Sequence, residues 1–140
     1  MEAIDILRPV FVVGLLTTSM LLWMVATRLP SMAKLGLDAQ EGQDTRKLRD
    51  KLPHEVNRVA NNYNHLFEQP TLFYAVAISI ALLGQVDPFY VGCAWIYAGL
   101  RIVHSLVQAL IDEVRIRFGL FMLSWLILGT MLVRVTLANL

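Results

Sequence analysis

The chain is short of charged residues and has almost no cysteine, and each shortage excludes a class of protein. Only 16% of its 140 residues are Asp, Glu, Lys or Arg, whereas 56% are hydrophobic, a balance too apolar for a soluble domain of this size. The formal net charge is +1, and no basic block suits a nucleic acid, so we expect no nucleic-acid partner. The single cysteine, Cys93, excludes an intrachain disulfide and a cysteine-based metal cluster. His65 and His104 are not at metal-ligand spacing, and we expect no metal site.

Long apolar runs take up most of the remaining sequence and predict membrane helices. Residues 10–27 approach the roughly 20 residues that cross a hydrocarbon core, and the acidic start (M-E-A-I-D) lacks the basic region of a cleavable signal peptide. Helix-start signals precede two later runs: Pro53 with Glu55, and Asp87 as N-cap followed by Pro88. Residues 31–52 are predicted to be a polar loop. We therefore predict an all-α fold, with residues 1–140 forming one integral membrane four-helix bundle whose helices cover about 9–29, 54–83, 88–111 and 117–138.

The positions of Lys and Arg predict the orientation of these helices. The loops after the first and third helices are basic, whereas the turn at 84–88 has no positive charge, so the positive-inside rule places both termini on the periplasmic or luminal side. The start of the second helix and the end of the third then share the cytoplasmic half of the membrane.

A polar stripe runs along the start of the second predicted helix. At about 100° per residue, its side chains fall within roughly a third of the helix circumference. A stripe of this kind cannot face lipid, so it must face protein or a polar ligand, and we predict a binding site here. Pro70 removes one helical hydrogen bond and is expected to bend this helix. The members of the stripe are Asn57, Arg58, Asn61, Asn64, His65 and Glu68.

The third predicted helix carries a matching stripe. It comprises Tyr90, Ala94, Tyr97, Arg101, His104, Ser105, Gln108 and Asp112. Placing Arg101 among apolar neighbours in hydrocarbon costs about 2.5 kcal/mol or more, so it needs a partner. Glu68 is the nearest candidate by depth, and such a pair could simply lock two helices together. Alternatively, Arg101 or a terminal arginine recognises a carboxylate or thiolate of a ligand.

Two motifs carry a family resemblance: N-N-Y-N-H-L-F-E-Q-P-T-L-F-Y at 61–74 and Y-A-G-L-R-I-V-H-S at 97–105. With the predicted four-helix pattern, they make the chain resemble the bacterial branch of the MAPEG superfamily, membrane-associated proteins in eicosanoid and glutathione metabolism. The resemblance implies a homotrimer in the bacterial inner membrane, with glutathione bound as co-substrate between subunits near the cytosolic side.

The resemblance also implies roles for individual residues. Glu68 would hold the glutathione amino group, with His65 and His104 beside it, and an arginine near the end of the third helix, Arg115 or Arg117, would activate the thiol. The remaining implied contacts are a carboxylate held by Arg58 or Arg101, and amides contacted by Asn61, Asn64 and Tyr97. The sequence departs from the family pattern at Asn61, where relatives have arginine, at His65, where they have asparagine, and at Pro70, which comes one residue early.

The function that follows is a glutathione-dependent transferase or peroxidase acting on a hydrophobic electrophile taken from the membrane. Two alternatives stay open. One is a non-enzymatic membrane module that binds a lipid-like ligand or a partner protein in the same groove, which the departures at Asn61 and His65 favour. The other is a structural trimer whose polar stripes only pair with each other.

Overall fold

The computed structural model describes residues 1–140 and is entirely helical, as predicted. Three of its helices, α1, α5 and α6, are long and apolar enough to cross a membrane. The 14-residue α4 falls short of that length by itself. The elements are α1 (Ala3–Lys34), the 3₁₀ helix η1 (Ala39–Gln43), α2 (Thr45–Lys51), α3 (His54–His65), α4 (Gln69–Leu82), α5 (Pro88–Leu110) and α6 (Val114–Asn139).

The predicted continuous helix over 54–83 is broken into α3 and α4. Glu68 has non-helical backbone angles (φ −89°, ψ −100°), and Pro70 lies in the first turn of α4. A proline is tolerated in a first turn because the backbone N–H that it lacks would have no helical partner there. Pro70 therefore begins a new helix instead of bending an existing one.

The predicted polar loop at 31–52 contains two short helices. Asp38 caps η1 by accepting a hydrogen bond from Gln40 N (2.8 Å), and Asp44 caps α2 by accepting from the backbone N–H groups of the next turn. α1 continues to Lys34, past its predicted end near residue 29, and hydrophobic contacts stabilise the additional turn. Its Met32 belongs to a small buried cluster with Leu48 of α2 and with Leu52 and Val56.

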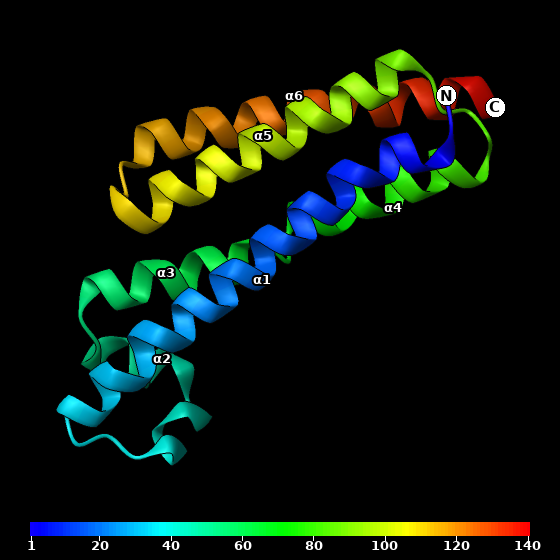
Figure 1. Ribbon diagram of the computed structural model, residues 1–140. Coiled ribbons are helices and arrows are strands. Elements are labelled where there is room, and N and C mark those ends of the chain that lie inside the picture. Colours follow the sequence, from blue (N-terminus) through cyan, green and yellow to red (C-terminus); the bar gives the residue numbers. More distant parts are fainter.

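The long helices run roughly lengthwise, so the molecule has two distinct ends (Figure 1). Both termini lie at one end, beside the turn between α4 and α5, and η1 and α2 lie at the other. α5 and α6 form a hairpin, and α1 packs against α3, α4 and α5. The two halves of the broken helix therefore share one long neighbour, α1.

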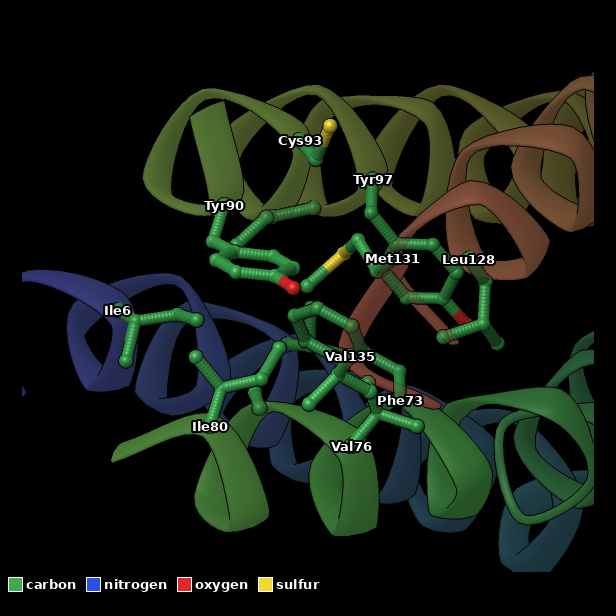
Figure 2. Packing of buried hydrophobic residues seen from close by; sticks show 14 residues of the cluster. Ile6, Phe73, Val76, Ile80, Tyr90, Cys93, Tyr97, Leu128, Met131 and Val135 are labelled. Atoms are coloured by element: carbon green, nitrogen blue, oxygen red, sulfur yellow. The ribbon is translucent and has the colours of Figure 1, made fainter. Parts of the chain in front are cut away.

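The main hydrophobic core lies at the end that holds the termini (Figure 2). It joins α1, α4, α5 and α6 through side chains such as Ile6, Phe73 and Met131, which are all fully buried. The ring of Phe73 stacks on Tyr97 with centroids 4.2 Å apart. The apolar part of α5 ends near Ala98, and beyond it the buried side chains of this helix are mostly polar.

An ion pair connects α6 to the start of α5 at the same end of the molecule. Asp87 caps α5 by accepting from Tyr90 N (2.9 Å), as predicted, and Arg134 of α6 donates to both carboxylate oxygens of Asp87 (2.6 and 3.1 Å). The Arg134 guanidinium also lies 4.6 Å from the Phe89 ring centroid and 4.5 Å from that of Tyr90, in reach of cation–π attraction.

Candidate functional site

Polar side chains fill the interior between the hydrophobic core and the far end of the molecule. On α5 they recur at three- and four-residue intervals, which places them on one helical face. Several of their atoms are buried and have no hydrogen-bond partner within the subunit, including Oγ of Ser105 and Oε1 of Gln108. The buried polar residues of this region are Asn62, Gln69, Arg101, His104, Ser105 and Gln108.

Arg101 lies at the centre of this interior and is fully buried. Its Nη1 donates a hydrogen bond to Gln69 Oε1 (3.2 Å), and the hydroxyl of Tyr97 donates to the same oxygen (3.4 Å). Nε and Nη2 of Arg101 have no partner, and no carboxylate lies within ion-pair distance of the guanidinium. A permanent positive charge is thus held inside the protein by a single neutral acceptor.

The predicted pairing of Glu68 with Arg101 is wrong for the isolated subunit. Glu68 is 65% exposed and accepts a hydrogen bond from His65 Nδ1 at 2.7 Å. The break between α3 and α4 is the physical cause, because it turns Glu68 outward and brings the next residue, Gln69, to face Arg101.

A pocket of about 190 Å³ opens beside these residues, between the end of α3 and the α5–α6 hairpin. The His65 ring lies between the ring of His104, 5.3 Å away, and that of Phe121, on which it stacks at 5.6 Å. Nδ1 of His104 has no partner. Two imidazoles therefore meet an arginine in one small pocket, whose lining is His65, His104, Val114, Arg117, Phe118 and Phe121.

The two arginines predicted to be catalytic have different surroundings. Arg117 lines the pocket, is 27% exposed and forms an ion pair with Asp112, while its Nε has no partner. Arg115 is exposed and lies outside the pocket. Asp112 also contacts His54 Nε2 at 3.1 Å, which ties the α5–α6 turn to the start of α3.

The predicted stripe of α3 is divided between two sites. Asn61 and Asn64 line a second pocket, between α1, α2 and α3, together with Asn57, whereas His65 faces the pocket of Arg117. Arg58 is half-buried, with an unpaired Nε, and lines neither pocket. The stripe is broad enough for its two edges to face different neighbours.

Gln69 and Asn62 are polar residues that the sequence interpretation did not select. Asn62 is fully buried, and neither polar atom of its side-chain amide has a partner. Its position in the run N-N-Y-N was the available signal, but on a regular helix it lies about 40° beyond Arg58, just outside the stripe. Gln69 follows Glu68 directly, and only the break turns it toward Arg101.

An apolar groove of about 640 Å³ runs along α1 and α4. Phe11, Leu15 and Ile78 line it, as do Leu66 and Phe67, which directly follow His65 in the chain. The groove is lined almost entirely by apolar side chains and shares no lining residue with the polar pocket.

Comparison with known proteins places the chain in one family. No curated protein and no solved structure matches it significantly. The model of the MAPEG family matches residues 6–137, which is nearly the whole chain. Its apolar helices accord with the membrane character of that family. This chain is therefore an integral membrane protein that belongs to the MAPEG family.

Proposed function

We propose that this protein is a membrane-embedded glutathione-dependent transferase or peroxidase that acts on a hydrophobic electrophile. In this proposal α3 and α4 together make a fourth membrane passage, three four-helix subunits form a homotrimer, and glutathione binds between neighbouring subunits. Membership of the MAPEG family supports the type of activity. The lengthwise run of α3 and α4 along α1 supports the fourth passage.

The observation that carries the proposal is the pocket shared by Arg117, His65 and His104. Arg117 presents a permanent positive charge there, and its Nε is free of any partner within the subunit. A thiol of ordinary pKa, about 8.5, is mostly protonated at neutral pH, and an adjacent guanidinium stabilises its thiolate. We assign the activating role to Arg117 and not to the exposed Arg115.

The neighbouring groups suit the rest of a tripeptide. Glu68 has an exposed carboxylate with one oxygen on His65, which lines the pocket, so in this proposal it holds the ammonium group of the ligand. His104 contributes a ring nitrogen with no partner. Arg58 and Arg101 stay predictions as carboxylate ligands, since neither lines this pocket in a single subunit.

The proposed setting is the bacterial inner membrane with both termini in the periplasm. Both termini lie at one end of the molecule and the pocket lies toward the other, so this orientation would open the pocket toward cytosolic glutathione. The apolar groove along α1 and α4 would bring the second substrate from the lipid phase.

A spectroscopic titration tests the proposal. Glutathione is added to the purified detergent-solubilised protein, and thiolate formation is followed by its ultraviolet absorbance. The wild type and Arg115→Gln should develop the thiolate signal near neutral pH, whereas Arg117→Gln should shift it to alkaline pH. If millimolar glutathione gives no signal with the wild type, the transferase proposal fails.

A second candidate is a non-enzymatic membrane module that binds a lipid-like ligand or a partner protein in the same intersubunit groove. The ion pair between Asp112 and Arg117 favours it, because the carboxylate offsets the charge that a thiolate would need. Conjugation of glutathione to a reactive aryl halide separates the two. A rate that falls on Arg117→Gln supports the enzyme, and no rate with the wild type supports the module.

A further inference from the structure

A second polar pocket lies between α1, α2 and α3, apart from the pocket of Arg117. It encloses about 310 Å³. Its charged lining consists of Arg28, Arg46 and Arg49, and no Asp or Glu lines it. Three arginines and no carboxylate make the potential of this pocket positive, so an anion placed there is favoured.

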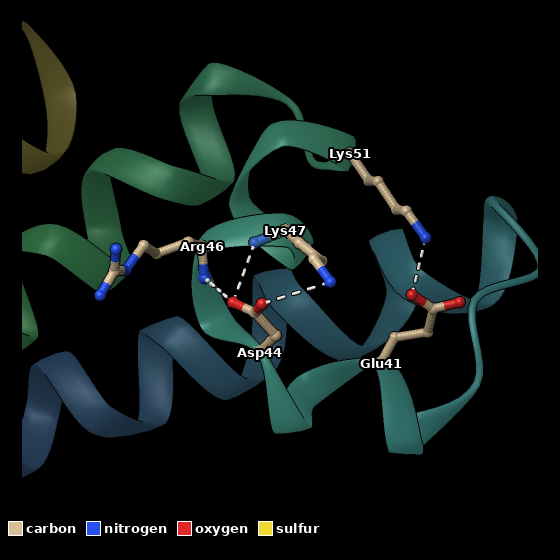
Figure 3. Close-up of polar contacts among 5 residues, drawn as sticks. All are labelled: Glu41, Asp44, Arg46, Lys47 and Lys51. Atoms are coloured by element: carbon tan, nitrogen blue, oxygen red, sulfur yellow. Dashed lines mark hydrogen bonds and ion pairs between the residues drawn. The ribbon is translucent and has the colours of Figure 1, made fainter.

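Two acidic residues of this region, Glu41 and Asp44, pair with lysines instead. Lys51 Nζ lies 2.6 Å from Glu41 Oε2, and Lys47 Nζ lies 3.7 Å from Asp44 Oδ2. Figure 3 shows the Arg46 side chain extending away from the Asp44 carboxylate, which accepts hydrogen bonds from the backbone N–H groups of Arg46 and Lys47 but none from the Arg46 guanidinium. Both lysines of α2 thus have a carboxylate partner, whereas Arg46 and Arg49 form no ion pair.

The helix that carries two of these arginines is held firmly in place. Asn57 Nδ2 of α3 donates hydrogen bonds to the backbone oxygens of Arg49 (2.7 Å) and Leu52 (3.0 Å). Leu48 of α2 is 2% exposed and packs in the cluster with Met32. The pocket is therefore pre-formed, which lowers the entropy cost of binding a small anion.

Arg28 places the pocket at the edge of the hydrocarbon region. It directly follows the apolar run at 10–27 and has a buried Nε with no partner. Leu21 and Val25, seven and three residues earlier on α1, lie on a neighbouring face and are exposed apolar side chains. A molecule in the pocket can thus combine an anionic head with acyl chains that lie along α1.

We propose that this pocket binds the phosphate group of an anionic phospholipid headgroup. Arginine forks suit phosphate oxygens because a planar guanidinium can donate two parallel hydrogen bonds. The side-chain amides of Asn61 and Asn64 line the same pocket and supply neutral donors. This pocket shares no lining residue with the pocket of Arg117, and it contains Asn61 and Asn64, which the family resemblance would assign to glutathione amides.

Two double variants of α2 test this assignment. Arg46→Gln/Arg49→Gln removes two pocket charges, and Lys47→Gln/Lys51→Gln removes the same charge from the same helix but outside the pocket. Each protein is reconstituted in phosphatidylcholine nanodiscs, with and without phosphatidylglycerol, and bound lipid is counted by native mass spectrometry after mild delipidation. A second arm measures the binding of inorganic phosphate in detergent, and thermal unfolding in phosphatidylcholine checks that each variant is folded.

The wild type and the lysine variant should retain phosphatidylglycerol, and the arginine variant should retain about tenfold less or lower still, given the strength of charge-assisted hydrogen bonds. Equal retention by the two variants would overturn the assignment, because it would reveal only general attraction to basic residues. Binding of inorganic phosphate by the wild type, without retention of phosphatidylglycerol, would overturn the lipid source and make the pocket a site for free phosphate.

Discussion

Replacing Gln69 with leucine removes the single acceptor that holds the buried Arg101 charge. Its oxygen receives one hydrogen bond from the guanidinium at 3.2 Å and a longer one from Tyr97 at 3.4 Å. A hydrogen bond to a charged group contributes about 1.5–3 kcal/mol and a long neutral one about 0.5 kcal/mol or less, so Gln69→Leu should cost about 2–3 kcal/mol of unfolding free energy. For a chain of this size, that corresponds to a melting temperature lower by roughly 4–10 °C.

Two further variants separate the loss of the hydrogen bond to Arg101 from the loss of side-chain packing. Gln69→Glu offers a carboxylate to Arg101 and should melt at or above the wild-type temperature. Gln69→Leu/Arg101→Met removes both partners and should recover most of the loss, because an apolar pair of similar volume leaves no buried charge unpaired. The assay is thermal unfolding in detergent without added ligand, arranged as a double-mutant cycle.

Two results would refute this reasoning. One is a wild-type melting temperature for Gln69→Leu, which would mean that Arg101 has another stabilising partner. The other is a double variant as unstable as Gln69→Leu alone, which would mean that the loss comes from packing and not from the orphaned guanidinium.

Three further predictions follow from other parts of the molecule. The arginine that donates to Asp87 holds the pKa of that carboxyl below its ordinary value of 3.8. The stability that this interaction gives is complete above pH 3.8 and is lost as the pH falls through the lower pKa of the folded protein. The difference in melting temperature between wild type and Asp87→Asn should therefore disappear in acid, and a difference that persists there would contradict the prediction. Phe73 is fully buried and Leu82 is 83% exposed, so Phe73→Ala should cost about 3–5 kcal/mol in a denaturant titration and Leu82→Ala about 0.5 kcal/mol or less. Asp112 has φ +58°, which asparagine also tolerates, so Asp112→Asn should keep the turn and release Arg117 from its counter-charge. The pH midpoint for forming the proposed glutathione thiolate should then be lower than in the wild type. A shift of that midpoint to alkaline pH would mean that the carboxylate is needed to orient the guanidinium.

The sequence predicted the elements that depend on local rules. Apolar runs of membrane length gave the all-helical class, and the pairing of Asp87 with Pro88 marked the start of α5, because capping and proline geometry act within a few residues. The motifs around Glu68 and Arg101 were sufficient to identify the family, which the match over residues 6–137 confirms.

The partners of the site residues could not be predicted, because they depend on a few backbone angles. A regular helix through Glu68 would present its carboxylate on the stripe, but the break gives that position to Gln69 and leaves Glu68 with His65. The α2 helix was also missed. Leu48 of α2 is buried by contacts with Met32 of α1 and Val56 of α3, and such tertiary contacts cannot be read from the local sequence.

The break at residues 66–68 gives the two ends of the subunit unequal resistance to opening. α4 is anchored in the main hydrophobic core with α5 and α6, whereas α2 is attached through a separate cluster of four buried side chains, to which α3 contributes Val56. Amide protection follows the local density of buried contacts, so hydrogen exchange should begin in α2, which buries only Leu48, while the amides of α4 stay protected. Because the break interrupts the helix between them, α3 can exchange its amide protons independently of α4 even though both pack against α1.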